Sequence, residues 1–240
     1  MLKDHKKMAT AKMRHSIRGQ LATALLELSL ACIALGAQPA GGERFVPPSV
    51  TVAGDILYPF EVVASGLVTL SVTLNGDGRP PSEWAEGRDI EGLTPLVSSV
   101  VTHWTYSPGM LEGDTTPSTI NIEVVFNPAD TLGEKLRVPP VASTLSLWPR
   151  GYVPPDVVAG SHASYPVNSV ASGTVVLDVT VDNNGRVKKI GVIRDVPSLT
   201  PGAIAAVRGW TIKPATLLSK AITSKLIVAF VFRPPNISKS

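Results

Sequence analysis

Apolar and polar residues alternate between Gly173 and Val181, with valine or leucine at every odd position from Val175. A period of two places one side of a β-strand on a core and the other side in water. The turn residues Asn183-Asn184-Gly185 follow, and a second apolar run begins at Val187. This order predicts a β-hairpin.

The pattern then changes to a helical period. Thr200-Pro201 predicts a helix start, with the hydroxyl as N-cap acceptor and the proline at the first helical position. Apolar residues recur at the spacing of one buried helical stripe, at Ala203, Val207 and Trp210. A last strand is predicted after Pro214, with one apolar face formed by Leu226, Val228, Phe230 and Phe232. The predicted order is hairpin, helix, strand.

The same series occurs earlier in the chain. Motif residues between Tyr58 and Arg79 recur 107 positions later, and those between Thr94 and Phe126 recur 106 positions later. They include Tyr-Pro, the alternating Val and Leu positions, the Gly-Arg turn, Thr-Pro, the Trp-x-x-x-Pro motif and the final Phe. So many coincidences in one order indicate an internal duplication of a unit of about 80 residues, the size of a small domain.

The first copy has a strong helix and closing strand but a weak second hairpin strand. Its helix carries a continuous stripe formed by Leu96, Val97, Val100, Val101 and Trp104. Its closing strand alternates, so Asn121 and Glu123 are expected on a solvated face. Prolines remove ladder donors, and Pro80-Pro81 therefore predicts that Arg79–Trp84 lies at an edge or in a loop.

The ordered set of motifs resembles the C-terminal domain of TonB, the energy transducer of Gram-negative envelopes. The closest local matches are Trp104-Thr-Tyr-Ser-Pro108-Gly109 in the first copy and Val181 to Val187 in the second. The resemblance implies an α+β protein with two tandem TonB-C-like domains, each a small antiparallel β-sheet with one main helix. We expect these domains at 47–128 and 154–234, joined by a linker at 129–153.

In this family an extended peptide, the TonB box of an outer-membrane transporter, adds by main-chain hydrogen bonds to the edge of the last strand. The resemblance therefore implies partner-binding residues in the Tyr-Pro motifs and closing strands: Tyr58, Pro59, Ile120, Ile122, Val124, Phe126, Tyr165, Pro166, Leu226, Val228, Phe230 and Phe232. A structural corner is the alternative interpretation of each Tyr-Pro pair. Both faces of Lys225–Arg233 are apolar, which indicates an edge covered by the other repeat or by a partner.

Composition and charge narrow the function. Apolar residues make up 44% of the chain and charged residues 17%, which favours globular folding. Residues 1–37 contain six basic and two acidic residues, leaving 16 basic and 17 acidic residues for the remainder. A nearly neutral folded part offers no electrostatic footprint for nucleic acid. The only cysteine is Cys32, so the rest of the chain has neither a disulfide nor a cysteine metal site.

The N-terminal segment 1–40 is predicted to be a signal peptide or membrane anchor, with an export signal favoured. A basic region, Lys3–Arg18, precedes an apolar run, Leu21–Ala37, which Glu27 interrupts. Either device places the repeats in the periplasm, because basic residues stay inside. The family resemblance implies that a working TonB transducer has a histidine in its membrane helix and a long spacer after that helix. The apolar run here has no histidine, and Gln38–Pro48 at roughly 3.3 Å per residue cannot cross an envelope.

No catalytic constellation is visible, and we expect no enzyme, no metal and no cofactor. His103 lies beside Trp104 at a predicted helix end, which indicates a structural imidazole. Ser98 and Ser99 lack a nucleophile elbow and an orienting acid. Asp182-Asn183-Asn184-Gly185 lacks the spaced ligands of a calcium loop and is better interpreted as a hairpin turn.

The leading hypothesis is a non-enzymatic, envelope-located protein-binding module that acts by strand addition at Ile120–Phe126 or Leu226–Phe232. One alternative is a TonB-type energy transducer, which would couple the inner-membrane proton motive force to outer-membrane transport. Another is a structural envelope protein whose repeats self-associate edge to edge. No nucleic-acid partner is expected.

Overall fold

A computed structural model describes residues 44–59, 65–81, 85–89, 92–130, 133–140 and 151–234. All of them belong to one compact unit, Arg44–Ser240, here called the folded unit. The predicted signal or anchor segment at 1–40 and residues 141–150 of the predicted linker lie outside the described residues.

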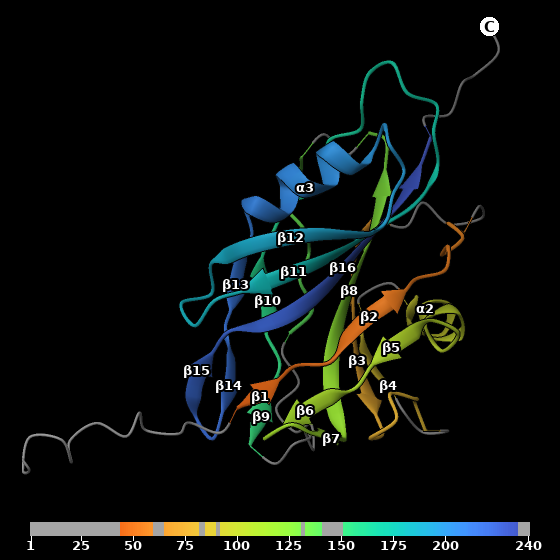
Figure 1. The fold of residues 1–240 in the computed structure, drawn as a ribbon. Coiled ribbons are helices and arrows are strands. Elements are labelled where there is room, and N and C mark those ends of the chain that lie inside the picture. Colours follow the sequence, from red (N-terminus) through yellow and green to blue (C-terminus); the bar gives the residue numbers. More distant parts are fainter. Residues whose placement is uncertain are drawn as a thin grey trace, which may run out of the picture. The chain divides into compact units, whose positions relative to one another are not determined.

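A six-stranded sheet in the order β12-β11-β16-β8-β3-β4 forms the centre of the described part (Figure 1). Its strands are β3 (Gly66–Leu74), β4 (Ala85–Arg88), β8 (Ser118–Pro128), β11 (Gly173–Val181), β12 (Val187–Arg194) and β16 (Ser224–Arg233). Neighbouring strands are antiparallel except β8 and β16, which pair in parallel from Ile122 and Ile227 to Pro128 and Arg233. Residues 47–128 and 154–234, here called the first half and the second half, therefore share one sheet.

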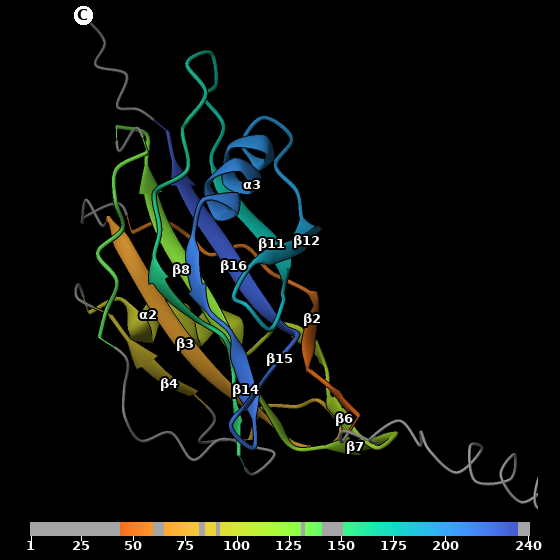
Figure 2. The ribbon, with the colours of Figure 1, turned by 90° about the vertical axis from the view of Figure 1, so that its left-hand side faces the viewer.

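The two helices of the described part, α2 (Thr94–Val101) and α3 (Thr200–Arg208), pack on opposite faces of this sheet (Figures 1 and 2). The core under α2 contains Ile122 and the core under α3 contains Leu177. Side chains of β16 alternate between the two cores: Leu226, Val228, Phe230 and Phe232 lie under α3, and Ile227, Ala229 and Val231 lie under α2. Both faces of β16 are apolar because both are covered.

Short strands complete each half in the same order. The first half has β1 (Phe45–Val46), β2 (Ser49–Val52), β5 (Thr105–Ser107), β6 (Gly109–Leu111) and β7 (Asp114–Thr116). The second half has β9 (Tyr152–Val153), β10 (Asp156–Ala159), β13 (Thr211–Lys213), β14 (Ala215–Leu217) and β15 (Lys220–Ile222). In both halves the first of these strands pairs with the fourth, the second with the third, and the fourth with the fifth. Corresponding elements begin 106 or 107 residues apart, apart from the shorter β4.

The predicted hairpin and closing strands are confirmed, but the predicted N-cap role of the helix-start threonines is wrong. Thr94 and Thr200 are themselves the first helical residues, and neither cap position makes a side-chain hydrogen bond. In each half an aspartate five residues earlier contacts the threonine that begins the helix. Asp89 accepts the Thr94 backbone N–H at 2.5 Å, and Asp195 accepts the Thr200 hydroxyl. A carboxylate is favoured near a helix N-terminus because it satisfies otherwise unpaired donors.

The predicted solvated face of the first closing strand is also wrong. Asn121 is 4% exposed and Glu123 is fully buried. The strand is not half-buried because the chain from Pro154 onward covers that face, and the Asn121 amide donates to the Pro155 carbonyl at 3.0 Å. The expectation that the proline-rich stretch is displaced to an edge agrees with β4, which begins only at Ala85 and ends the sheet.

Each half is tied to the other by its own N-terminal strap, defined as 47–58 in the first half and 154–165 in the second. Arg88 of the first half contacts Asp156 of the second strap at 3.0 Å. In return, Arg194 of the second half contacts Asp55 of the first strap at 3.6 Å. Arg88 and Arg194 are equivalent, being 106 residues apart at the ends of β4 and β12. The straps therefore interlock the halves reciprocally.

The shared sheet gives a prediction for Ile227, a second-half residue that lies in the core of the first half. Ile227→Ala should lower the free energy of unfolding by about 2–5 kcal/mol, because it leaves a cavity in a core that cannot fully collapse. Unfolding should remain one transition when followed by circular dichroism and by tryptophan fluorescence. The control Val192→Ala, at a side chain 46% exposed, should cost less than about 0.5 kcal/mol. Two separate transitions in the Ile227 variant would contradict a shared sheet.

Candidate functional site

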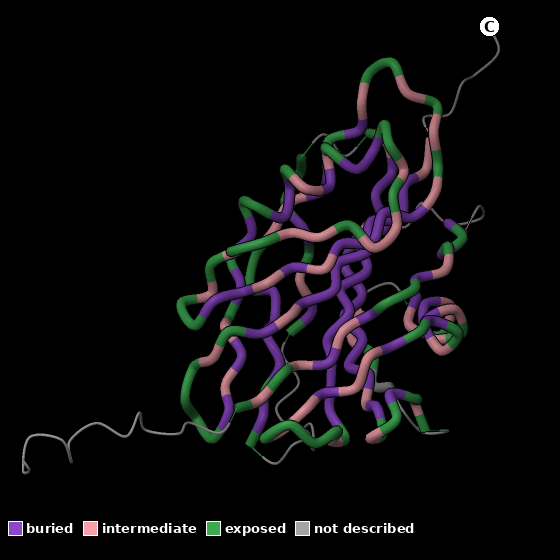
Figure 3. The backbone as a smooth tube through the Cα atoms, in the orientation of Figure 1, coloured by how far each residue is buried: buried purple, intermediate pink, exposed green. Residues whose placement is uncertain are grey.

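The residues predicted to bind a partner lie mainly in the interior. Tyr58, Tyr165 and the predicted residues of both closing strands are at most 8% exposed. Pro59 and Pro166 are partly exposed. Figure 3 shows the central strands as almost continuously buried. In this structure the predicted site is part of the two cores.

Neither of the segments predicted to accept a strand, Ile120–Phe126 and Leu226–Phe232, is an open edge in this structure. β8 is hydrogen-bonded to β3 on one side and β16 on the other. β16 is likewise bonded to β11 and β8. Lys225–Arg233 is covered as expected, by β8 and by the core under α2. That these residues contact a partner stays a prediction.

The tyrosines of the two Tyr-Pro motifs pack on phenylalanines of the closing strands, Tyr58 on Phe126 and Tyr165 on Phe232. The Tyr58 ring meets Phe126 edge-on at 5.6 Å, and the Arg233 guanidinium lies 5.6 Å from the Tyr58 ring centre. Burial raises the pKa of Tyr58 to about 12, so its hydroxyl stays protonated. The Tyr165 hydroxyl donates to the Ala171 carbonyl at 2.5 Å. Arg233, at the end of the second half, thus contacts Tyr58 of the first half.

Glu123 of β8 is a buried acid, although the sequence pattern predicts a solvated side chain at this position. Glu123 accepts a hydrogen bond from the Thr69 hydroxyl at 2.6 Å through Oε2, whereas Oε1 has no partner among the described residues. Burial raises the pKa of Glu123 to about 8; the Thr69 bond lowers it and the charge of Asp156 raises it further. Glu123 is therefore mainly a neutral acid at pH 7.

A buried histidine lies on the same side of β8. His162 is 3% exposed, with Nε2 3.3 Å from the Ser65 hydroxyl and Nδ1 3.3 Å from Asn127 Oδ1. Burial lowers the pKa of His162 to about 4, and the charge of Arg137 adds to this. The imidazole is neutral at pH 7, and among the described residues no carboxylate contacts it, so the contact between Ser65 and His162 lacks the orienting acid of a catalytic triad. Its signal in the sequence was weak, because the first copy has no equivalent histidine.

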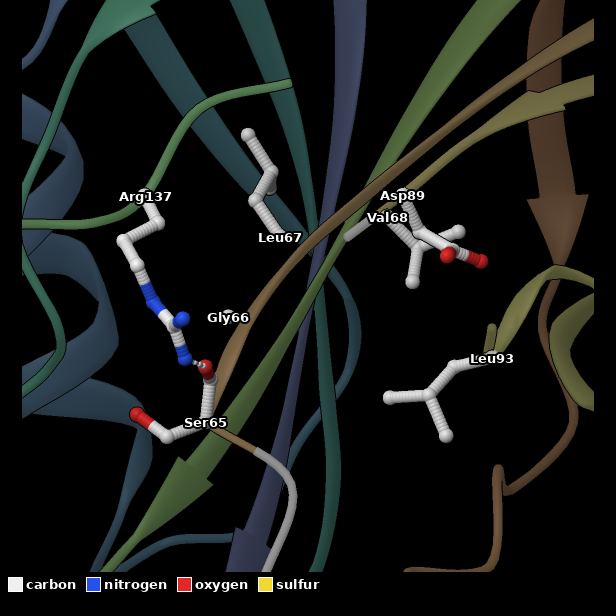
Figure 4. A pocket seen from close by; sticks show the side chains of 7 residues that line it. All are labelled: Ser65, Gly66, Leu67, Val68, Asp89, Leu93 and Arg137. Carbon is white, nitrogen blue, oxygen red and sulfur yellow. Dashed lines mark hydrogen bonds between the residues drawn. The ribbon is translucent and has the colours of Figure 1, made fainter. Parts of the chain in front are cut away.

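Two hollows of the described part differ in size, and the smaller one does not suit a small substrate. One, of about 10 Å³, lies beside the start of β3; Figure 4 shows Arg137 reaching the Ser65 carbonyl on one side of that strand, with Asp89 and Leu93 on the other. It holds about one water molecule, whereas ligand pockets measure roughly 300–1,000 Å³. A wider surface hollow of about 470 Å³ follows α3 between Asp195 and Arg208.

Other candidate chemistry is structural. His103 is exposed at the end of α2, with Nδ1 2.9 Å from the Ser99 carbonyl, as the helix-end interpretation predicts. No group of three His, Cys, Asp or Glu side chains in the described residues is placed to hold a metal ion. Among these residues no helix is long and apolar enough to cross a membrane.

Comparison with known proteins supports the family resemblance for the second half. Residues 162–234 match the family model described as the Gram-negative bacterial TonB protein C-terminal. Members of that family are non-enzymatic domains that interact with envelope proteins. The matched segment contains β11, β12, α3 and β13 to β16. Searches of curated proteins and of solved structures find no match.

The buried acid predicts a specific pH dependence. Because Glu123 keeps its proton up to about pH 8 when folded, while an unfolded chain releases it near the ordinary glutamate pKa of 4.5, the free energy of unfolding falls as pH rises through this window. Glu123→Gln retains the shape without the charge. Measured by urea unfolding, the variant should match wild type near pH 4.5 and gain up to about 1.4 kcal/mol per pH unit above it. Glu134→Gln, at an exposed acid, is the control; a gain that does not change with pH would contradict a buried neutral Glu123.

Proposed function

We propose that this protein is a non-enzymatic protein-binding module of the cell envelope, and that it binds an extended partner peptide by strand addition. The match at 162–234 supports envelope protein binding. We further propose that the first half is a second copy of the same unit. The same order of elements at a separation of 106 or 107 residues supports this duplication.

One observation supports binding by strand addition: β16 already pairs with a strand from outside the matched segment. β12, β11 and β16 are consecutive antiparallel strands of the matched segment, and β16 is the last of the three. β8 adds to its free side through seven consecutive residue pairs, from Ile227 to Arg233. Main-chain pairing of this kind is how extended peptides bind sheet edges. A partner peptide would take the place of β8.

The two outer edges of the sheet are poorer acceptors. β4 has only four residues, Ala85–Arg88. β12 has register shifts near both ends, opposite Val176/Leu177 and Thr180/Val181 of β11. Short strands and bulges are common protections of sheet edges against added strands. A ten-residue strand with continuous register, such as β16, therefore offers the most regular ladder.

If a partner peptide replaces β8, the surroundings of β8 determine which side chains the peptide must carry. β8 supplies Val124 to the core under α2 and Val125 to the core under α3. A peptide that occupies this position must be extended and apolar on both faces over part of its length. We place the module in the periplasm, as the family resemblance implies, with the N-terminal segment as export signal or anchor.

A second candidate, a structural envelope unit, is favoured by the completeness of the β8–β16 pair. If β8 never leaves, the edge is permanently filled and the halves form one rigid block. The buried contacts of Ile227, Ala229 and Val231 with the first core oppose separation. The two candidates differ in whether β8 can be replaced.

A cross-strand cysteine pair tests replacement of β8. Val124 and Ala229 are register partners in β8 and β16, so Val124→Cys with Ala229→Cys, in a Cys32→Ser background, should lock the pair when oxidised. The probe is a labelled synthetic peptide with the sequence Ser118–Pro128, and its scrambled version is the control. We expect binding, followed by fluorescence anisotropy, to the reduced protein and loss of binding on oxidation.

Equal binding to the reduced and the locked protein would exclude β16 as the acceptor. No binding to either form, with native circular dichroism, would exclude strand replacement and leave the structural unit. Mass spectrometry reports the extent of disulfide formation in each sample.

A further inference from the structure

The two halves of the folded unit carry opposite charge. Residues 47–128 contain two basic and ten acidic residues, a net charge of −8. Residues 154–234 contain nine basic and four acidic residues, a net charge of +5. The near neutrality of the whole unit therefore conceals a strong separation of charge between two halves of the same fold.

The basic residues of the second half gather on one side. Arg186 and Lys188 follow the β11–β12 turn, and Lys213 ends β13. These segments touch, because a side chain at Gly185 would collide with the Ile212 carbonyl. Figure 1 places the turn, β13 and the β14–β15 hairpin along one side, away from α2 and β4. The exposed cations of these segments, of β12 and of the end of α3 are together called the basic side: Arg186, Lys188, Lys189, Arg208, Lys213 and Lys220.

Most of these cations have no acidic partner. In the described residues Lys189, Arg208, Lys213 and Lys220 form no ion pair. Lys188 lies 3.6 Å from Asp182, but its side chain is 64% exposed. Asp182 already accepts the backbone N–H groups of Asn184 and Arg186 at 2.9 Å each. The positive charge of the basic side is thus largely uncompensated.

The first half serves as an internal control for what the fold requires. At the equivalent positions it has Thr102 for Arg208, Ser107 for Lys213 and Asp114 for Lys220. The equivalent strands and helix form there without these charges. By contrast, Arg88 and Arg194 are shared, and both make the ion pairs that interlock the halves. The unshared cations are not needed for folding, which points to interaction.

We propose that the basic side binds an acid-rich segment of a partner protein. This inference rests on the proposed protein-binding function, but not on strand addition at β16. The lysines and bulges of β12 disfavour main-chain pairing there, so recognition is through side-chain charge. A polyanion larger than the basic side, such as nucleic acid or a continuous anionic membrane surface, would also meet the first half with its charge of −8. A short acidic segment fits within the positive region alone.

The test uses the full chain and a labelled peptide of about twelve residues in which glutamate alternates with glycine. Fluorescence anisotropy should show binding that weakens as salt is raised, because exposed pairs are screened. The triple variant Lys189→Gln, Lys213→Gln and Lys220→Gln should bind about tenfold more weakly, since exposed ion pairs contribute about 0.2–1 kcal/mol each. The matched control is Arg44→Gln, Arg79→Gln and Lys135→Gln, which removes three exposed cations outside the basic side.

We expect the control variant to bind as wild type does. Equal weakening in the two triple variants would show a general charge effect and overturn the proposal, as would a lack of binding to the wild type. Anionic phospholipid vesicles and polyphosphate are tested in the same way. If either binds more strongly than the peptide, and if this binding is lost in the same triple variant, the proposed protein partner is wrong and the basic side binds another polyanion. If the wild-type protein binds the Ser118–Pro128 peptide but does not bind the acidic peptide, this inference is rejected and the proposed function stands.

Discussion

The structure depends on the parallel pairing of β8 with β16. A strand in the middle of a sheet needs hydrogen-bonding partners on both sides and cover on both faces. β16 obtains its partners from β11 and β8, and its cover from the cores under α2 and α3. The two closing strands run in the same direction, and the strand order on either side of them is mirrored. A rotation by half a turn about an axis along these strands therefore superposes one half on the other and exchanges the two faces of the sheet. The helices therefore lie on opposite faces, and neither half completes its core alone.

This arrangement makes equivalent positions chemically unequal. Ile227 and Ala229 of β16 lie in an apolar core, whereas the equivalent Asn121 and Glu123 of β8 lie against the second strap. Asn121 is satisfied, since it accepts from Ser71 and donates to Pro155. Glu123 has one oxygen without a partner in the described residues, and it avoids the cost of a buried charge by keeping its proton. Equivalent strand positions of the two halves thus face an apolar core in one half and a polar strap in the other.

Local periodicity was sufficient to predict most of the secondary structure. The alternation from Val175 to Val181 predicts a strand, and the spacing of Ala203 and Val207 predicts a helix. The faces of Glu123 and Ile227 could not be predicted, because they depend on pairing between segments about 106 residues apart, and period-two alternation does not say what covers each face. The apolar character of both faces of Lys225–Arg233 was the one sequence signal that a strand edge is covered. The buried His162 left no periodic signal, since its partners come from β8 and from Ser65.

Amide hydrogen exchange resolved along the chain tests the shared sheet most directly. If β8 and β16 pair as described, the amides of Val124–Phe126 and Val228–Phe230 should be among the slowest to exchange. Those of β4 and β12, at the edges of the sheet, should exchange faster. Fast exchange on one side of β16, at the level of the edge strands, would show that the strand is an open edge. That result would contradict the single sheet on which the rest of the structure depends.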